Sequence, residues 1–276
     1  MTTNRRDWPL GVSGTIEKEI LAEYQQAGIH RMELSYGEVD QWLELNFMQN
    51  ARDYVKRAQA YDVTIHSVHL PFYQKNNCID PTSSELEVKR HILSLQSELI
   101  RATGDAGIPI AVIHPSNEPY EEAERAIRIE NCTEILAKLT AIAKEAGVTL
   151  ALENLPRSCI CRVKEEMQQI LAAIPDLRVC FDSNHCLLQT NPDYIRAVGD
   201  KIVTLHISDY DFINERHLLP GEGMNYWENI LTALEEVGYY GVFNYEITRK
   251  NLRTGRKISF AEIYENYVQL LQGAFR

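Results

Sequence analysis

The chain has 276 residues, 45% of them hydrophobic and 24% charged, an ordinary globular balance, and no apolar stretch approaches the roughly 18 residues that a membrane-spanning helix needs. A formal net charge of −11 repels phosphate backbones, so we expect no nucleic-acid partner, although a bound metal would reverse the sign locally. The six cysteines, Cys78 among them, contain no Cys-x-x-Cys pair, and the N-terminus lacks the apolar core of a signal peptide, so we expect reduced thiols in a cytoplasmic protein without a membrane partner.

One structural unit recurs along the chain: a short apolar, β-branched run, a polar loop, and a stretch with apolar residues three or four positions apart. Gly107, Gly147 and Gly238 follow three of these stretches, as glycines at helix C-terminal caps do. The pattern predicts strands at residues 9–13, 31–35, 63–69, 108–114, 149–154, 178–182, 202–208 and 242–247. It predicts helices at residues 16–27, 85–106, 121–146, 227–237 and 260–272.

This alternation predicts an α/β fold with a parallel sheet and helices outside it. Eight strand-helix units are the number that closes a (β/α)8 TIM barrel, and no linker or shift in composition divides residues 1–276, so we expect one domain. An open doubly wound sheet is the alternative. The barrel is favoured because residues with useful chemistry follow many strands, whereas an open sheet concentrates its site at one switch point.

Four predicted strands end on side chains that bind divalent metals, namely Glu153, Asp182, His206 and Glu246. The intervals between them are 29, 24 and 40 positions, close to one strand-helix unit. The C-terminal ends of barrel strands meet on the face where barrel enzymes have their active sites. A single carboxylate at a strand end is often only a solvated loop residue, but this set of four indicates a site for Zn, Mn, Co or Mg.

Three further histidines lie at or just beyond the ends of predicted strands. His185 comes three residues after Asp182 and can reach a metal or a substrate oxygen, although this segment can also be a helix-capping loop. His69 opens a His-Leu-Pro turn and His114 a His-Pro turn, where extended backbone directs the ring toward the barrel axis. Each alone can be a satisfied core histidine; the same placement of both favours substrate binding.

The loop at residues 209–223 carries Arg216 and His217 before a Pro-Gly turn. Side chains on such a loop lie over the barrel mouth. An arginine and a histidine there are suited to an anionic or polyhydroxylated substrate. The alternative is a plain surface loop.

These residues resemble the xylose-isomerase-like barrel superfamily, which joins sugar and sugar-phosphate isomerases and epimerases with the type-IV apurinic endonucleases. The resemblance covers nearly the whole chain and is carried by Leu152-Glu153-Asn154, Phe181-Asp182-Ser183-Asn184-His185, His206-Ile207-Ser208-Asp209, the segment 217–223 and Tyr245-Glu246. Resemblance to the ketose epimerases implies one divalent metal on Glu153, Asp182, His206 and Glu246. It also implies that Glu153 and Glu246 exchange the substrate proton while His185 contacts a carbohydrate-like substrate.

The endonuclease branch binds three zinc ions, and its additional ligands match His69, His114, His185, Glu215 and His217, with Asp in place of Glu215. Additional metal ions are therefore open, and a multinuclear zinc phosphoesterase is the alternative function. The acidic charge and the lack of basic, aromatic-rich loops favour the isomerase. A non-catalytic binding protein is disfavoured by the intact carboxylate set. A homo-oligomer is open too, because barrels of this kind occur as monomers, dimers and tetramers.

Overall fold

The computed structural model describes residues 6–74, 79–118, 121–213, 215–251 and 254–275, so Cys78 lies outside the described residues. Its strands are β1 (Leu10–Gly14), β2 (Arg31–Ser35), β3 (Thr64–His69), β4 (Ile110–Ile113), β5 (Thr149–Glu153), β6 (Arg178–Asp182), β7 (Ile202–His206) and β8 (Phe243–Tyr245). Its helices are α1 (Lys18–Ala27), α2 (Val39–Glu44), α3 (Phe47–Gln59), α4 (Leu86–Asp105), α5 (Arg125–Glu145), α6 (Lys164–Ala173), α7 (Asn191–Val198), α8 (Trp227–Glu236) and α9 (Phe260–Leu271), with short 3-10 turns η1 (Glu122–Glu124) and η2 (Gly199–Lys201).

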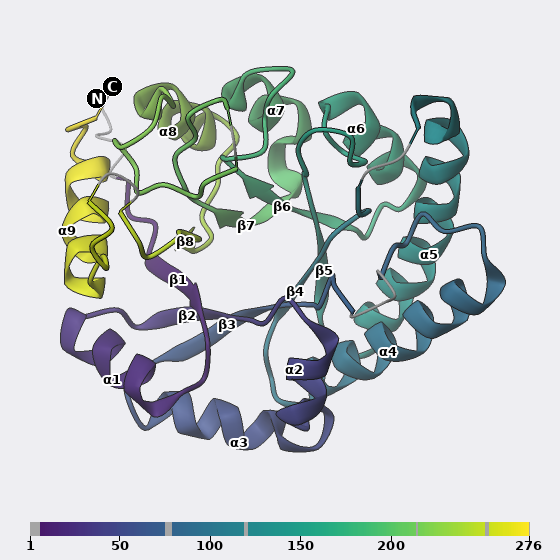
Figure 1. Cartoon of the computed structure of the whole chain (residues 1–276), viewed down its shortest axis with the longest axis horizontal. Coiled ribbons are helices and arrows are strands. Elements are labelled where there is room, and N and C mark those ends of the chain that lie inside the picture. The colour runs from purple at the N-terminus through teal and green to yellow at the C-terminus, as the bar shows by residue number, and fades with distance from the viewer. Residues whose placement is uncertain (1–5, 75–78, 119–120, 214, 252–253, 276) are drawn as a thin grey trace.

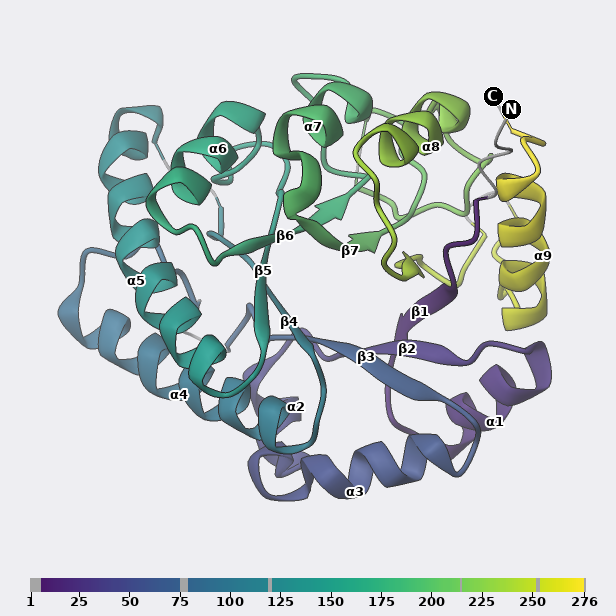
Figure 2. The same ribbon diagram turned by 180° about the vertical axis from the view of Figure 1, so that it is seen from behind.

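The strands form one parallel sheet in the order β7-β6-β5-β4-β3-β2-β1-β8. The helices surround the strands, as Figure 1 shows from one side and Figure 2 from behind. Beyond β7, the Ile207 N–H donates to the Asn244 carbonyl at 2.8 Å, and the Glu246 N–H donates to the Ile207 carbonyl at 3.1 Å. These two bonds join the last pair of strands, so the fold is the predicted TIM barrel.

Two β-bulges change the strand register and so determine which residues of neighbouring strands lie side by side near the barrel mouth. On β3, His66 is an extra residue opposite the Met32–Glu33 step, which brings Ser67 level with Glu33. On β7, Val203 is the extra residue, which brings His206 level with Asp182 on β6. Bulges of this kind re-aim side chains and are common beside active sites.

The main core fills the space between strands and helices, while the barrel interior has two contrasting halves. Val112, Ala151 and Cys180, from β4, β5 and β6, form a separate buried apolar cluster. Ser13, Glu33 and Ser67 share one register level on β1, β2 and β3, and Asn244 on β8 donates to the Ser13 hydroxyl at 2.8 Å. Half of the interior is therefore polar beneath the mouth.

All eight predicted strands are confirmed, and so are the five predicted helices, with shifts of a few residues at their ends. The helix expected at 121–146 is divided into η1 and α5, because Glu124 leaves α-helical geometry with φ −88° and ψ −6°. The pattern missed α2, α3, α6 and α7. Gly107, Gly147 and Gly238 have φ of +76°, +72° and +72°, the left-handed conformation expected just past a helix.

Five cysteines lie in the described residues, and all of them are buried free thiols: Cys132, Cys159, Cys161, Cys180 and Cys186. Across the same part of the chain, no helix combines the length and apolarity needed to cross a membrane.

Gly104 marks a close approach between the end of α4 and the residue after α5. A methyl group added to Gly104 would overlap the carbonyl oxygen of Ala146. We expect Gly104→Ala to lower the free energy of unfolding by about 1–3 kcal/mol, because this overlap outweighs a helix-propensity gain of about 1 kcal/mol. Urea denaturation tests this, with Arg101→Ala as an exposed control in the same helix, expected to change stability by less than about 0.5 kcal/mol. An unchanged or raised midpoint for Gly104→Ala would contradict the expectation.

Candidate metal centre

The chemistry-bearing side chains gather at the C-terminal ends of the strands. Glu153, Asp182 and His206 are the last residues of β5, β6 and β7, and all three are buried. His69 ends β3 in the same way, and Glu246 comes directly after β8. Since parallel barrel strands all end on one face, residues far apart in the sequence meet at a single mouth.

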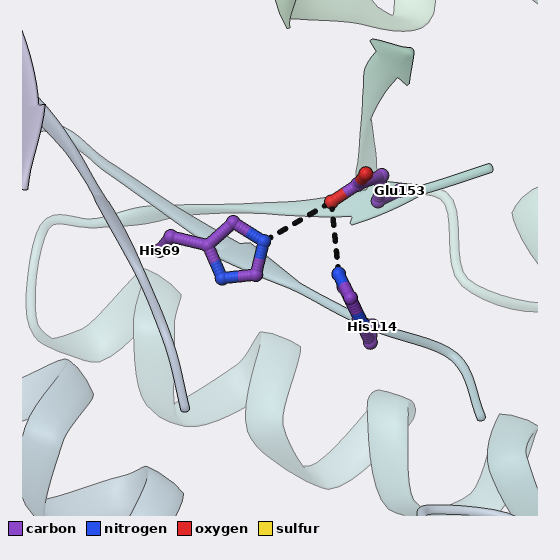
Figure 3. Close-up of side chains that lie close together, drawn as sticks. All are labelled: His69, His114 and Glu153. Carbon is purple, nitrogen blue, oxygen red and sulfur yellow. Dashed lines mark hydrogen bonds and ion pairs between the residues drawn. The ribbon is translucent and has the colours of Figure 1, made fainter. Parts of the chain in front are cut away.

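Glu153 lies at the centre of this group, with only 1% of the residue exposed. Its Oε2 atom lies 3.2 Å from His69 Nε2 and 3.2 Å from His114 Nε2, and the two rings approach it from different sides in Figure 3. Its Oε1 atom lies 3.3 Å from His206 Nδ1 and 3.4 Å from His185 Nδ1. One carboxylate thus stands between four imidazoles, and each of its oxygens serves two of them.

The four predicted metal ligands form one set. Glu153, Asp182, His206 and Glu246 each offer an atom within 4.8 Å of the others. His206 Nδ1 is 3.2 Å from Glu246 Oε2 and 3.9 Å from Asp182 Oδ2. Two ligand atoms about 2.1 Å from a shared ion stand up to about 4.2 Å apart. The spacing is therefore close to that of a divalent metal site.

Unsatisfied polar atoms support the same fit. Asp182 Oδ2 and His206 Nδ1 are buried, and neither has a hydrogen-bond partner within the described structure. Burying a polar atom without a partner is costly, and a bound ion is one of the species that satisfy such atoms in native folds. A cation between these two atoms would satisfy both.

His185, Glu215 and His217 form a further group beside Asp182, which lies 3.6 Å from His185 Nδ1 through its Oδ2 atom. His185 Nε2 is 3.2 Å from Glu215 Oε1, and His217 Nε2 is 3.5 Å from the same oxygen. These three residues offer ligand atoms within 4.8 Å of one another. The other Glu215 oxygen is 2.5 Å from Arg157 Nη1, and Arg157 also pairs with Glu118, so one guanidinium links three loops at the mouth.

Four histidines of the cluster use one ring nitrogen to hold the ring and turn the other toward a carboxylate. His69 Nδ1 and His185 Nδ1 bond the backbone carbonyls of Leu70 at 2.9 Å and Asn154 at 2.8 Å. His217 Nδ1 is 3.2 Å from the Glu246 carbonyl, and His206 Nε2 is 2.9 Å from Glu33 Oε1. Because carbonyls and carboxylates only accept, these nitrogens carry the hydrogen. This arrangement is typical of metal-binding histidines.

The buried carboxylates of the cluster require positive charge nearby to compensate their own. Burial opposes ionisation of Glu153, but His206 and His114 outweigh it and hold the pKa of this carboxyl well below its usual range. Burial also opposes protonation of His185, yet Asp182 and Glu215 raise its pKa to about 10. Without a metal, protonated imidazoles supply the charge that the carboxylates require, and a divalent cation would supply the same charge.

Two residues fix the loops that carry these ligands. The Asn154 side chain accepts from the Asp182 N–H at 2.7 Å and donates to the Asp182 carbonyl at 2.9 Å, which joins the ends of β5 and β6. Asp209 accepts from the backbone N–H groups of Gly221 at 2.8 Å and Asn225 at 3.0 Å, and from the Trp227 indole at 3.0 Å. The loop with Glu215 and His217 is therefore anchored at its base.

The sequence analysis named ten residues as site residues or additional ligands. All of them except Arg216 lie in this cluster: His69, His114, Glu153, Asp182, His185, His206, Glu215, His217 and Glu246. Arg216 differs, because its Nε is 2.8 Å from Asp211 Oδ2 and its side chain is 40% exposed. Reading the strand ends also picks out Glu33, but the sequence analysis assigned it no role, and it missed Arg157. Glu33 lies level with Ser13 and Ser67 in the sheet, but its partner His206 is 173 positions away in the sequence. Arg157 lies in a loop without apolar periodicity.

Comparison with known proteins agrees with this fold. The family model described as xylose isomerase-like TIM barrel matches residues 21–265. An uncharacterized protein of Methanocaldococcus jannaschii is 26% identical over 232 residues, which cover 81% of this chain and 76% of that protein. An inosose isomerase of Bacillus velezensis is 24% identical over 221 residues, covering 75% of this chain and 79% of that protein. The crystal structure of a D-tagatose 3-epimerase-like protein has a TM-score of 0.77 at 23% identity, covering 96% of this chain and 99% of that chain.

The chain therefore belongs to the xylose isomerase-like TIM barrel family, and the resemblance noted in the sequence is confirmed. Sugar isomerases are among its distant sequence relatives.

Metal should stabilise the fold measurably. Adding Mn²⁺, Co²⁺ or Zn²⁺ to chelator-treated protein at about 100 times its dissociation constant should contribute about 2.7 kcal/mol, which raises the unfolding midpoint by about 5–10 °C. Asp182→Asn should lose most of this shift, because it weakens one ligand of the buried set. Glu236→Gln, on the exposed surface of α8, is the matched control and should keep the shift. Equal midpoints with and without metal in the wild-type protein would exclude a metal centre.

Proposed function

We propose that this protein is a divalent-metal-dependent isomerase or epimerase that acts on a small carbohydrate-like substrate by proton transfer next to a carbonyl. The observation that carries the proposal is the set of Glu153, Asp182, His206 and Glu246, with its two unpartnered buried atoms. A relative named an inosose isomerase supports the same class of reaction.

Glu153, Asp182, His206 and Glu246 would hold the ion. Carboxylate and imidazole ligands accept Zn, Mn, Co and Mg, so the ligand set leaves the choice among them open. When bound, the metal supplies a Lewis acid that polarises the substrate carbonyl and makes the neighbouring C–H more acidic.

Glu153 and Glu246 are the proposed proton carriers. Glu246 has 25% of its side chain exposed, whereas Glu153 has 1%. We therefore place Glu246 on the open side of the substrate and Glu153 on the inner side. One carboxylate removes the proton and the other returns it: return to the opposite face of the same carbon gives an epimer, and return to the neighbouring carbon gives an isomer.

Histidines and an aromatic ring would bind the rest of the substrate. His69, His114, His185 and His217 surround the two glutamates, and their Nε2 atoms, which face the cluster, can bond substrate hydroxyls. The Phe72 ring stacks on His114 at 4.3 Å between centroids. Arg216 remains a predicted substrate-binding residue. Its ion pair with Asp211, and the pairing of Arg157 with two glutamates, favour a neutral polyhydroxylated substrate over a phosphorylated one.

A second function, multinuclear phosphoester hydrolysis, is favoured by a specific observation. Both oxygens of Glu153 are shared between histidine pairs, and His185, Glu215 and His217 form a further candidate ligand group. Such sharing suits a carboxylate that bridges two metal ions. The net charge of −11 argues against a nucleic-acid duplex as the phosphoester substrate.

Metal stoichiometry separates the two functions. We expect elemental analysis of protein purified without chelators to find about one divalent ion per chain, and Glu246→Gln to lose it because one carboxylate ligand is removed. Glu236→Gln should retain the ion. Two or three zinc ions per chain would contradict the mononuclear proposal and favour phosphoester hydrolysis.

Proton exchange tests the catalytic assignment. In D2O, the wild-type protein should exchange the proton next to the carbonyl of a ketose or inosose that it accepts, as followed by NMR. Glu153→Gln and Glu246→Gln should each slow this exchange by at least about 10²–10⁴-fold, because the amide cannot take the proton. Glu236→Gln should exchange at the wild-type rate. Wild-type exchange in either of the first two variants would exclude that residue as a proton carrier.

A further inference from the structure

We infer that Glu33 is a positioning residue that acts through His206: it fixes the imidazole so that Nδ1 faces the metal. The inference rests on the proposed function, because it requires a metal at the centre. Glu33 belongs to none of the candidate ligand groups found among the described residues, so its role would be indirect.

The contact between the two residues crosses the barrel. Glu33 is on β2 and His206 is on β7, and β1 and β8 stand between these strands in the ring. His206 Nε2 lies 2.9 Å from Glu33 Oε1, and both residues are fully buried. Since the carboxylate can only accept, the hydrogen of the neutral imidazole is on Nε2. The lone pair is then on Nδ1, the atom that lies near Glu153, Asp182 and Glu246.

Glu33 is itself held on both oxygens. Ser67 donates to Oε2 at 2.8 Å, and Ser13 donates to Oε1 at 3.1 Å. Asn244 donates to the Ser13 hydroxyl at 2.8 Å, which directs that hydroxyl's hydrogen toward Glu33. Donors from β1 and β3, the first of them oriented by Asn244 on β8, thus prevent the Glu33 carboxylate from rotating. Because this acceptor is fixed, the orientation of the His206 ring that donates to it is fixed as well.

A purely structural role is a poor account of this residue. A fully buried carboxylate carries a large desolvation cost, and an apolar side chain of similar size is often as stabilising. The bulge at His66 brings Ser67 level with Glu33, and Ser67 can therefore donate its hydroxyl hydrogen to the Glu33 carboxylate. A carboxylate on the second nitrogen of a metal-binding histidine orients the ring and makes it a stronger ligand, and losing it typically weakens metal affinity about 10–100-fold.

The experiment is a Co²⁺ titration of chelator-treated full-length protein, read by visible absorption and by competition with a chelator. Four variants are compared with the wild-type protein: Glu33→Gln, His206→Ala, the double variant and Thr204→Val. Thr204 is the matched control, because it is buried on the same strand as His206 and its hydroxyl makes no hydrogen bond within the described structure. Urea denaturation of each metal-free variant reports its folding separately.

We expect Glu33→Gln to bind Co²⁺ about 10–100-fold more weakly and with an altered absorption spectrum, and Thr204→Val to bind like the wild type. The double variant should bind no more weakly than His206→Ala, because Glu33 acts through that ring. Unchanged affinity and spectrum in Glu33→Gln, or an equal further loss in the His206→Ala background, would overturn the inference and leave the metal centre intact. A wild-type protein that binds no Co²⁺ would overturn the proposed function and this inference with it.

Discussion

The buried carboxylate of Glu153 is the constraint on which the site depends. Four imidazoles approach its two oxygens at 3.2–3.4 Å, at a position where 1% of the residue is exposed. A lone buried carboxylate would be strongly disfavoured. The surrounding rings make it stable. Two of them are in turn tied to other elements, His185 to the Asn154 carbonyl after β5 and His206 to Glu33 on β2. Removing any one partner leaves a buried charge uncompensated, so the cluster acts as a unit rather than as separate pairs.

The barrel supplies this cluster with its geometry. Each strand adds one or two polar residues at its C-terminal end, and the apolar faces that pack on the helices hold the strands in place. The interior beneath the mouth is apolar at Val112, Ala151 and Cys180 and polar around Glu33. This asymmetry matters because Glu33 in the polar half bonds His206, while Asn154 bonds Asp182 and His185 and Asp209 anchors the base of the loop with Glu215 and His217. The ligands are thus supported on two sides by hydrogen bonds.

Much of this arrangement could be predicted from the sequence, and the exceptions have physical causes. Strands stood out because apolar runs of five or six residues recur at unit spacing, and their terminal residues identified Glu153, Asp182, His206 and Glu246. The missed helix α3 buries Phe47, Ala51, Tyr54 and Ala58, a regular but weakly apolar stripe. The two bulges could not be foreseen, because strand register is decided by pairing and not by composition. The contact of Glu33 with His206 depends on that register, so it was invisible in the sequence.

The number of metals that this site would hold depends on how Glu153 divides its oxygens. Oε1 faces His206 within the four-residue ligand set, and Oε2 faces His69 and His114 on the opposite side. With one ion bound by the four-residue set, His69 and His114 would keep their hydrogens toward Oε2 and hold the carboxylate as donors. With a second ion on the Oε2 side, the same two nitrogens must lose their hydrogens and become ligands. For His69, the second ring nitrogen decides how easily Nε2 loses its hydrogen. His69 Nδ1 already donates to the Leu70 carbonyl, so a neutral His69 presents a lone pair at Nε2. A protonated His69 would therefore accompany one bound ion, and a neutral His69 would accompany a second.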